Sequence, residues 1–456
     1  MFIGAMRTLI LPIALIAAVC SSPAAAQTQA PTPVVETGSS ATRADQTSAQ
    51  VQSGSAAPAA GNSTGGNVAW VLMATVLVLM MGFPGIALFY SGLSRPKNSV
   101  NAFMQTMGAV ALGSLAFLFI GFGVAFLPGN ALIGVPAWPS SWIELSSAVD
   151  KLYPGVPIGL FAMFQLAFAA VTVAILLGAW VERVRFPFVL AFVPLWVIVV
   201  YSPVARWVWS EHGWLHQLGA IDFAGGTVVH VCSGFSALAL ALVLGKRHGF
   251  GKESFEPNNT ALVALGAAFL IVGWYGFNAG SALAADSAAV RALVNTHAAA
   301  CAGVAVWITI ELVTRGFTTL IGVLTGAIGA LVAVTPASGF VTPEASVLIG
   351  ALGAGAAWLG AVMLRRLGMF DDSLDVFGVH GLAGIAGSLA TGLFAVRALA
   401  PGASLGAQMT ATLVVAVYAF IATATLAVAL QTVLRARVSS NEEKVGLDTT
   451  YHGEPA

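Results

Sequence analysis

Two histidines of this 456-residue chain lie in apolar segments at the same distance from an aspartate. His230 follows Asp222 by eight residues, and His380 follows Asp372 by the same number. An ionisable side chain inside a bilayer is costly, so it tends to face a cavity or a pathway. A neutral imidazole has one donor and one acceptor nitrogen, so such a pair could hydrogen-bond a small polar molecule and relay a proton. A third histidine in an apolar segment, His297, has no such counterpart and is assigned to packing.

Other chemistry for these two histidines is less favoured. A lone intramembrane histidine often only bonds to a neighbouring helix, but a matched pair argues against that role. A metal site is not predicted, because His230 and His380 have no third Cys, His or carboxylate at a suitable depth. Cys232 and Cys301 lie in apolar stretches, so no disulfide framework is expected either. Since no nucleophile or paired carboxylates accompany the histidines, we predict no enzyme and no cofactor.

The composition indicates a membrane protein. Hydrophobic residues make up 58% of the chain and charged residues only 8%, whereas a soluble domain carries about 25% charged residues. A water-exposed surface with so few charges would associate, so a soluble protein is excluded. The net charge is zero and Lys and Arg are scattered, which excludes nucleic acid as a partner.

The apolar runs predict the fold. A bilayer core needs about 20 apolar residues per helix, and eleven such runs follow one another. We therefore predict an all-α polytopic membrane protein with eleven transmembrane helices between residues 68 and 434. The spans are 68–93, 100–126, 158–180, 186–205, 224–244, 260–279, 288–313, 318–334, 346–364, 376–396 and 408–434.

The segments outside these spans predict the topology. Residues 1–26 have a basic residue, an apolar stretch and a Pro-Ala-Ala-Ala end, which is typical of a cleavable signal peptide; an uncleaved helix is the alternative. Residues 27–67 are polar and small and predict a disordered periplasmic arm. Thirteen of the nineteen Lys and Arg residues fall on the side assigned inside. By the positive-inside rule, the tail at 435–456 is then cytoplasmic and the protein lies in the inner membrane.

In this topology, spans five and ten enter the membrane from opposite sides. The core would then be an inverted repeat of five plus five helices, followed by one C-terminal helix. Eight residues of helix carry each histidine about 12 Å below its own surface, near the midplane. We therefore predict that His230 and His380 meet at the centre of the membrane.

Several strings of residues make the chain resemble the ammonium transporter family Amt/Mep/Rh, in its bacterial Amt form. The resemblance runs from about residue 68 into the tail. It is carried by residues 84–90 (PGIALFY), 182–186 (ERVRF), 222–230 (DFAGGTVVH), 273–281 (GWYGFNAGS) and 375–380 (DVFGVH). Ser91 and Pro96 depart from the usual turn after the first span, and Trp180 and Val181 stand where smaller residues are common. The resemblance implies eleven helices around one pore per subunit, assembled as a homotrimer.

The resemblance also implies roles for individual aromatic and hydroxyl residues. Trp209 and Phe168 match the outer recruitment site, where a π face attracts a cation. Ser281 matches the hydroxyl that accepts a hydrogen bond from bound ammonium. Phe277 and Phe168 match the two rings that close the outer end of the pore, and Trp274 lines the pore below them.

The function implied by the resemblance is ammonium uptake. A metal cation would lose its hydration in an apolar pore, whereas ammonium can leave its proton behind and cross as ammonia past His230 and His380. Asp222 matches a buried acid at a helix start, which favours a nearby cation; a purely structural role is its alternative. Net charge transfer driven by the membrane potential is expected. The alternatives are a passive ammonia gas channel and an ammonium sensor with little flux.

The tail also resembles the family. Gly446, Leu447 and Asp448, and then residues 452–454 (HGE), match the C-terminal segment that helps to dock PII-type signal proteins at the cytoplasmic face. A solvated tail without a partner is the alternative.

Overall fold

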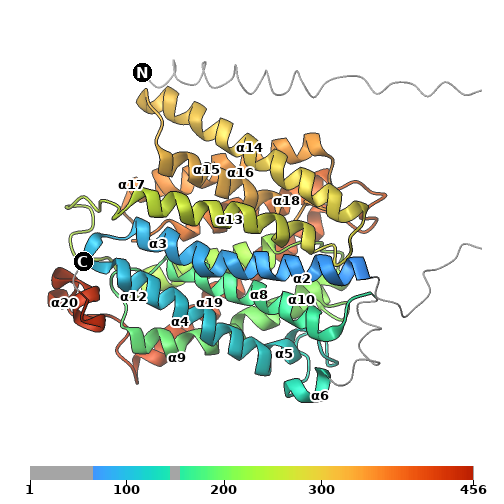
Figure 1. Ribbon diagram of the computed structural model, residues 1–456, viewed down its shortest axis with the longest axis horizontal. Coiled ribbons are helices and arrows are strands. Elements are labelled where there is room, and N and C mark those ends of the chain that lie inside the picture. Colours follow the sequence, from blue (N-terminus) through green and yellow to red (C-terminus); the bar gives the residue numbers. More distant parts are fainter. Residues whose placement is uncertain (1–64, 144–154, 455–456) are drawn as a thin grey trace, which may run out of the picture. The chain divides into compact units, whose positions relative to one another are not determined.

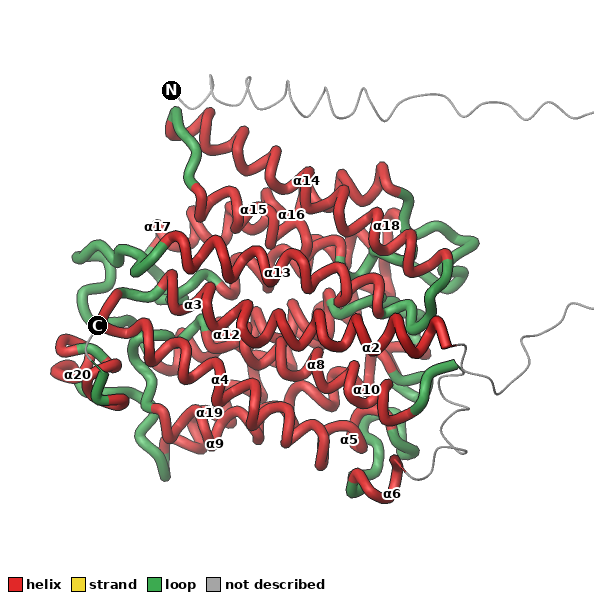
Figure 2. The backbone as a smooth tube through the Cα atoms, viewed as in Figure 1, coloured by secondary structure: helices red, strands yellow, loops and turns green. Residues whose placement is uncertain are grey.

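The protein is described from a computed structural model, which covers residues 65–143 and 155–454. All the elements named in this part of the chain are helices (Figure 2). Singly or joined end to end, they form ten helical runs that are long and apolar enough to cross a membrane, and one shorter apolar helix accompanies them. The prediction of an all-helical, multi-pass membrane protein is thus confirmed. The predicted signal peptide and residues 27–64 of the predicted arm lie outside the described residues.

The first five spans run from α2 to α12, and most of them consist of two or more helical segments. The first contains α2 (Gly65–Met80), η1 (Met81–Ile86) and α3 (Ala87–Leu93), and the second η2 (Pro96–Asn98), α4 (Ser99–Ala116), η3 (Phe117–Gly121) and α5 (Phe122–Phe126). After the short α6 (Pro139–Ile143) come α8 (Ile158–Leu177), then α9 (Phe186–Trp196), η4 (Val197–Tyr201), α10 (Ser202–Trp209) and α11 (Trp214–Gln217), then η5 (Gly226–Val231) and α12 (Cys232–Leu244).

The remaining spans run from α13 to α19. They are α13 (Thr260–Gly280), α14 (Ser287–Arg315), α15 (Leu320–Val334), α16 (Pro343–Trp358) with η6 (Leu359–Leu364) and α17 (Arg365–Leu367), η7 (Phe377–Leu382) with α18 (Ala383–Phe394), and α19 (Leu405–Gln431). The tail adds α20 (Ser440–Val445) and η8 (Asp448–His452).

Polar residues immediately before the helices define where several of them begin. The side chains of Asn259, Asp286, Thr319, Thr342 and Ser404 accept hydrogen bonds from free backbone N–H groups in the first turns of α13, α14, α15, α16 and α19. Such caps satisfy donors that have no partner within the helix. Hydrophobic length thus predicts each span, and the capping residue sets its first turn.

Most predicted boundaries differ from the structure by a few residues, and three of the differences affect the local fold. The first helix begins at Gly65, so residues 65–67 of the predicted arm are helical. The helix predicted to end at residue 180 ends at Leu177, and the following turn is buried. The eighth span has only 15 helical residues, and turns at 335–340 follow it, of which residues 335–339 are buried.

The long helices lie side by side, and their two ends differ (Figure 1). The short helices α17 and α20 lie at one end, and α6 lies at the opposite end. We call the first the basic end, because the buried guanidinium groups of Arg183 and Arg247 lie there together with Arg95. It corresponds to the side that the sequence predicts to be cytoplasmic.

The tail packs on the basic end. Leu447 and Asp448 are fully buried. The carboxylate of Asp448 accepts hydrogen bonds from the backbone N–H groups of Val100 and Asn101, at 3.0 and 2.7 Å, in the first turn of α4. A carboxylate is favourable at a helix N-terminus. Residues 446–448 are therefore packed against the folded domain, whereas residues 449 and 450 are exposed.

Candidate functional site

The segment that carries His230 is organised by Asp222. Gly225 has φ +112°, a left-handed conformation that favours glycine, and it turns the chain into η5. The Asp222 carboxylate accepts four backbone hydrogen bonds at 2.8 to 3.0 Å, from residues 225–228. One side chain thus satisfies the free N–H groups at the start of this helix, and His230 follows in the same short segment.

Asp372 occupies the equivalent place before His380. One of its carboxylate oxygens accepts a hydrogen bond from the N–H of Phe377, the first residue of η7, at 2.6 Å. Both histidines therefore lie in a short, wide helical segment that follows a buried aspartate by a few residues. The matched spacing noticed in the sequence corresponds to matched local structure.

The structure brings the two histidines together. Nδ1 of His230 lies 3.1 Å from Nδ1 of His380, and the ring centroids are 5.2 Å apart with the planes inclined by 24°. Glycines allow this approach, because a Cβ atom on Gly234 would lie 2.3 Å from the backbone nitrogen of Gly381. Since two ring nitrogens are in hydrogen-bond contact, one Nδ1 carries the proton and the other accepts it.

Because only one of the two Nδ1 atoms carries the shared proton, the Nε2 atoms of the two histidines have different hydrogen-bonding roles. The histidine that donates from Nδ1 presents Nε2 as an acceptor, and its partner presents an Nε2–H donor. Nε2 of His230 is buried and has no hydrogen-bond partner among the described residues. The pair can therefore offer one donor and one acceptor to a small molecule.

A group of aromatic rings adjoins the histidine pair, beginning with Phe277, whose ring centroid lies 6.0 Å from that of His230. The rings of Phe168 and Phe277 stack with centroids 4.2 Å apart, and both side chains are buried. The half-buried indole of Trp209 meets Phe168 edge-on at 5.6 Å. Trp209 is held in place by a 2.9 Å hydrogen bond from its Nε1 to the carbonyl oxygen of Asp222.

Ser281 and Trp274 complete the set of residues predicted from the sequence. The Ser281 hydroxyl donates to the carbonyl of Phe277 at 2.8 Å, so its oxygen keeps lone pairs that can accept from a cation. The Trp274 ring stacks on His230 with centroids 5.3 Å apart. Its Nε1 donates to Thr335 at 2.9 Å. Ring contacts thus link six of the eight predicted residues, namely Trp209, Phe168, Phe277, His230, Trp274 and His380. The other two join this column through backbone carbonyls, because Ser281 donates to that of Phe277 and Trp209 donates to that of Asp222.

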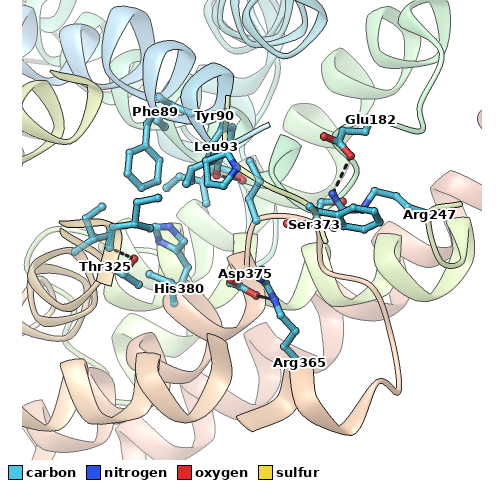
Figure 3. Close-up of a pocket in the computed structure, with 18 of the residues that line it drawn as sticks. Phe89, Tyr90, Leu93, Glu182, Arg247, Thr325, Arg365, Ser373, Asp375 and His380 are labelled. Atoms are coloured by element: carbon cyan, nitrogen blue, oxygen red, sulfur yellow. Dashed lines mark hydrogen bonds and ion pairs between the residues drawn. The ribbon is translucent and has the colours of Figure 1, made fainter. Parts of the chain in front are cut away.

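A cavity of about 590 Å³ extends from the histidine pair toward the basic end (Figure 3). His230, His380 and Trp274 line it at one extreme, and charged residues such as Glu182 and Arg247 line it at the other. Phe168 and Phe277 are not among the residues that line it. The cavity therefore ends at the two buried histidines, and the stacked phenyl rings of Phe168 and Phe277 lie outside it.

Sequence reasoning missed the charged groups around this cavity. Glu182 bonds both Arg95, at 2.8 Å, and Arg247, at 3.1 Å, and Arg247 also bonds Asp371 at 2.9 Å. Burial alone would raise the pKa of Glu182, but the guanidinium groups of Arg247 and Arg95 hold it below its usual value. A second ion pair, between Arg365 and Asp375, also faces the cavity (Figure 3).

The remaining histidine of the apolar segments lies elsewhere. His297 is exposed on α14, where the hydroxyl of Tyr275 lies 2.7 Å from its Nδ1. Within residues 65–143 and 155–454 there is no group of three or more His, Cys, Asp or Glu side chains that could hold a metal ion.

Comparison with known proteins identifies close relatives of the chain. Residues 69–456 match the model of the Ammonium Transporter Family. The ammonium transporter of Bacillus subtilis is 41% identical over 401 residues, which cover 86% of this chain and 98% of that protein. Ammonium transporter Amt1 of Archaeoglobus fulgidus is 41% identical over 399 residues, covering 86% and 99%.

Solved structures agree with these sequence matches. A structure described as a sensor Amt protein superposes with a TM-score of 0.79 at 31% identity and covers 85% of this chain and 98% of its own. Mep2 of Saccharomyces cerevisiae superposes with a TM-score of 0.74 at 33% identity, covering 83% and 90%.

Proposed function

This chain belongs to the ammonium transporter family and transports ammonium, and we propose that it recruits ammonium at Trp209, Phe168 and Ser281 and passes it as ammonia between His230 and His380. The observation that carries this proposal is the 3.1 Å contact of two buried imidazoles at the head of a cavity. The backbone carbonyl of Asp222 holds the Trp209 indole at the recruitment site, and the negative charge of the Asp222 carboxylate would favour a nearby cation.

The recruitment site suits a small cation that can donate hydrogen bonds. The faces of the Trp209 and Phe168 rings carry negative charge density, which attracts a cation by about 0.5 to 2 kcal/mol. The Ser281 oxygen adds an acceptor for one N–H group of ammonium. The stacked pair of Phe168 and Phe277 must then move apart to let the molecule pass, so these rings act as a gate.

Selectivity follows from what each ion loses beyond that gate. Potassium or sodium would give up its water shell to a passage walled by Phe277, Trp274 and two imidazoles, which cannot replace the hydration. Ammonium can lose one proton and continue as a neutral molecule. Ammonia both donates and accepts hydrogen bonds, so it matches the donor and the acceptor that the histidine pair presents.

We propose that net charge crosses the membrane with each molecule, driven by the membrane potential. The two histidines share one proton and can pass it on by exchanging which nitrogen carries it, so the pair is suited to a relay.

In the proposed orientation the N-terminus faces the periplasm and the basic end faces the cytoplasm, which agrees with the distribution of Lys and Arg.

The proposed assembly is a homotrimer in the inner membrane, with one pore in each subunit. A PII-type signal protein is the proposed partner at the basic end. The packed tail supports this second proposal, because residues 446–452 form a fixed surface beside the start of α4.

Uptake of radiolabelled methylammonium by cells that lack other ammonium transporters tests the route. His230→Ala and His380→Ala each remove the shared hydrogen bond, and uptake should fall about tenfold or more, which corresponds to about 1.4 kcal/mol of barrier. His297→Ala is the matched control, because this histidine is exposed on α14, and its uptake should equal that of the parent. Parent-like uptake by both pore variants would contradict the proposal.

Currents in reconstituted vesicles distinguish the alternatives. Net charge transfer predicts a current that follows the applied ammonium gradient and disappears in the two pore variants. Uptake without current would indicate a passive ammonia channel. Tight binding of ammonium with little uptake would indicate a sensor, the description attached to one of the solved relatives.

A further inference from the structure

A buried glutamine on α19 holds the backbone next to the recruitment site. Gln408 lies in the first turns of the C-terminal span and is 1% exposed. Its amide oxygen accepts a hydrogen bond from the N–H of Ile221, and its amide nitrogen donates to the carbonyl of the same residue, both at 2.8 Å. The side chain therefore pairs with Ile221 as a neighbouring β-strand would, and fixes this residue in two directions.

The residue after Ile221 is Asp222, on which the recruitment site depends. Its carbonyl oxygen holds the indole of Trp209 at 2.9 Å, and its carboxylate caps the segment that leads to His230. A shift of the Ile221 backbone would move the Asp222 carbonyl directly. Trp209 would then lose the hydrogen bond that orients its ring against Phe168.

Gln408 also reaches the second half of the molecule. Its amide nitrogen contacts the carbonyl oxygen of Ser388 on α18, at 3.2 Å. The Ser388 hydroxyl accepts from Thr412 at 2.7 Å and lies 3.3 Å from the hydroxyl of Thr227. Gln408 thus joins the loop before η5 to the helix that follows η7, so the two histidine-bearing elements share one anchor.

We propose that Gln408 is a positioning residue for the outer recruitment site, acting through Ile221 and Asp222 on Trp209. The proposal rests on the proposed function, because it concerns the residues that bind ammonium. Packing alone does not account for a glutamine here. An apolar side chain of the same length would fill the space in the membrane without the cost of burying an amide, whereas only an amide bonds both backbone groups of Ile221.

The test is the concentration dependence of methylammonium uptake in Gln408→Met. Methionine keeps the length of the side chain and removes its hydrogen bonds. The half-saturation concentration should rise about five-fold, because Trp209 is less well oriented, while the maximal rate stays within about two-fold, because the histidine pair is intact. A merely structural defect would lower the amount of folded transporter, and hence the maximal rate, without changing the half-saturation concentration.

Gln105→Met is the matched control. Gln105 is also buried and donates to a backbone carbonyl, that of Val184, but it lies at the basic end. Its half-saturation concentration should equal that of the parent. Gln408→Leu also removes both hydrogen bonds to Ile221 without burying a charge, so it should give a similar rise, and it replaces Gln408→Met if that variant does not fold.

The outcomes separate this inference from the proposed function. If the parent takes up methylammonium and both Gln408 variants have its half-saturation concentration, Gln408 is not a positioning residue, although the transport route stands. An equal change in Gln105→Met would also overturn the inference. If the parent itself takes up no methylammonium, the proposed function fails first.

Discussion

Two adjacent aspartates at the basic end have opposite electrostatic environments. Asp371 and Asp372 are both buried. Burial would raise the pKa of Asp371, but the guanidinium groups of Arg247 and Arg183 hold that pKa below its usual value. No Lys or Arg among the described residues forms an ion pair with Asp372, and burial raises its pKa to about 6. The ionised form of Asp371 therefore stabilises the folded protein, whereas for Asp372 the protonated form does so.

These environments predict opposite pH dependences for Asp372→Asn and Asp371→Asn. The contribution of Asp372 to stability is complete below the unfolded pKa of about 4 and is lost as the pH rises through about 6. Relative to the parent, Asp372→Asn should therefore gain stability between pH 4 and pH 7, by at most about 1.4 kcal/mol per pH unit. Thermal unfolding of the detergent-solubilised proteins across this range measures the difference. A difference that does not change with pH would contradict the assignment.

Asp371→Asn should behave in the opposite way. The native pKa of Asp371 is lowered, so its contribution is present above pH 4 and is lost as the pH falls through that native value. Near pH 7 the variant leaves Arg183 and Arg247 short of a counter-charge and should lose about 3 to 5 kcal/mol. Its deficit relative to the parent should shrink in acid, which the same unfolding series would reveal.

At the scale of single residues, the sequence contained enough information to find the aromatic and histidine side chains of the site. It did not contain enough to find the charged groups that pair beside the cavity. The equal spacing of His230 and His380 from an aspartate is visible in the sequence, and the structure brings both imidazoles together. The pairing of Glu182 with Arg247 joins residues 65 positions apart. Nothing in local pattern or periodicity selects such partners, because they are set by how loops meet after the helices have packed.

The crossing of α12 and η7 determines how closely the two histidines approach. These elements touch through Gly234 and Gly381, where the backbones leave no room for a side chain. Small residues at a crossing allow this kind of close approach between helices in a membrane. The distance between the imidazoles thus depends on Gly234, four residues after His230, and on Gly381, the residue after His380.

We predict that Gly234→Ala impairs transport. The added methyl group would have to displace the backbone at Gly381 and costs about 1 to 3 kcal/mol of overpacking. It should also separate His230 from His380, so methylammonium uptake should fall about tenfold or more. Gly355→Ala on α16 is the control, since a Cβ there meets no atom within 4 Å. Normal uptake by purified, folded Gly234→Ala would show that the spacing of the pair is not critical.

Hydrophobic length predicted the spans well, whereas their internal breaks were not predictable from it. Ten spans are long apolar helices, as expected from runs of about 20 apolar residues. The eighth, α15, stops after 15 residues and continues as buried turns that place Thr335 against Trp274. The wide segments η5 and η7 likewise leave no hydropathy signal, because their residues are as apolar as those of a regular helix.

The tail connects three parts of the chain at the basic end. Arg185 forms an ion pair with Glu442, and the carboxylate of Glu443 accepts a hydrogen bond from the backbone N–H of His248 at 3.0 Å. The N–H of Arg185 also donates to the carbonyl of Ala436 at 2.8 Å. Together with the cap that Asp448 provides to α4, these contacts hold the tail against loops that also border the cavity. A partner that binds the tail would therefore lie next to loops that contain the cavity-lining residues Glu182 and Arg247.

Deletion of residues 441–456 should abolish co-purification with a PII-type signal protein, because it removes the surface proposed to dock that partner. Asp448→Ala is a milder test. It removes the cap on α4, at a cost of about 0.5 to 2 kcal/mol, so the tail should detach more often. Trypsin should then cleave the variant faster after Lys444, and less of the signal protein should co-purify with it. Glu454→Ala changes an exposed carboxylate of the same tail and should resemble the parent in both assays. Undiminished recovery of the signal protein after the deletion would rule the tail out as its docking site.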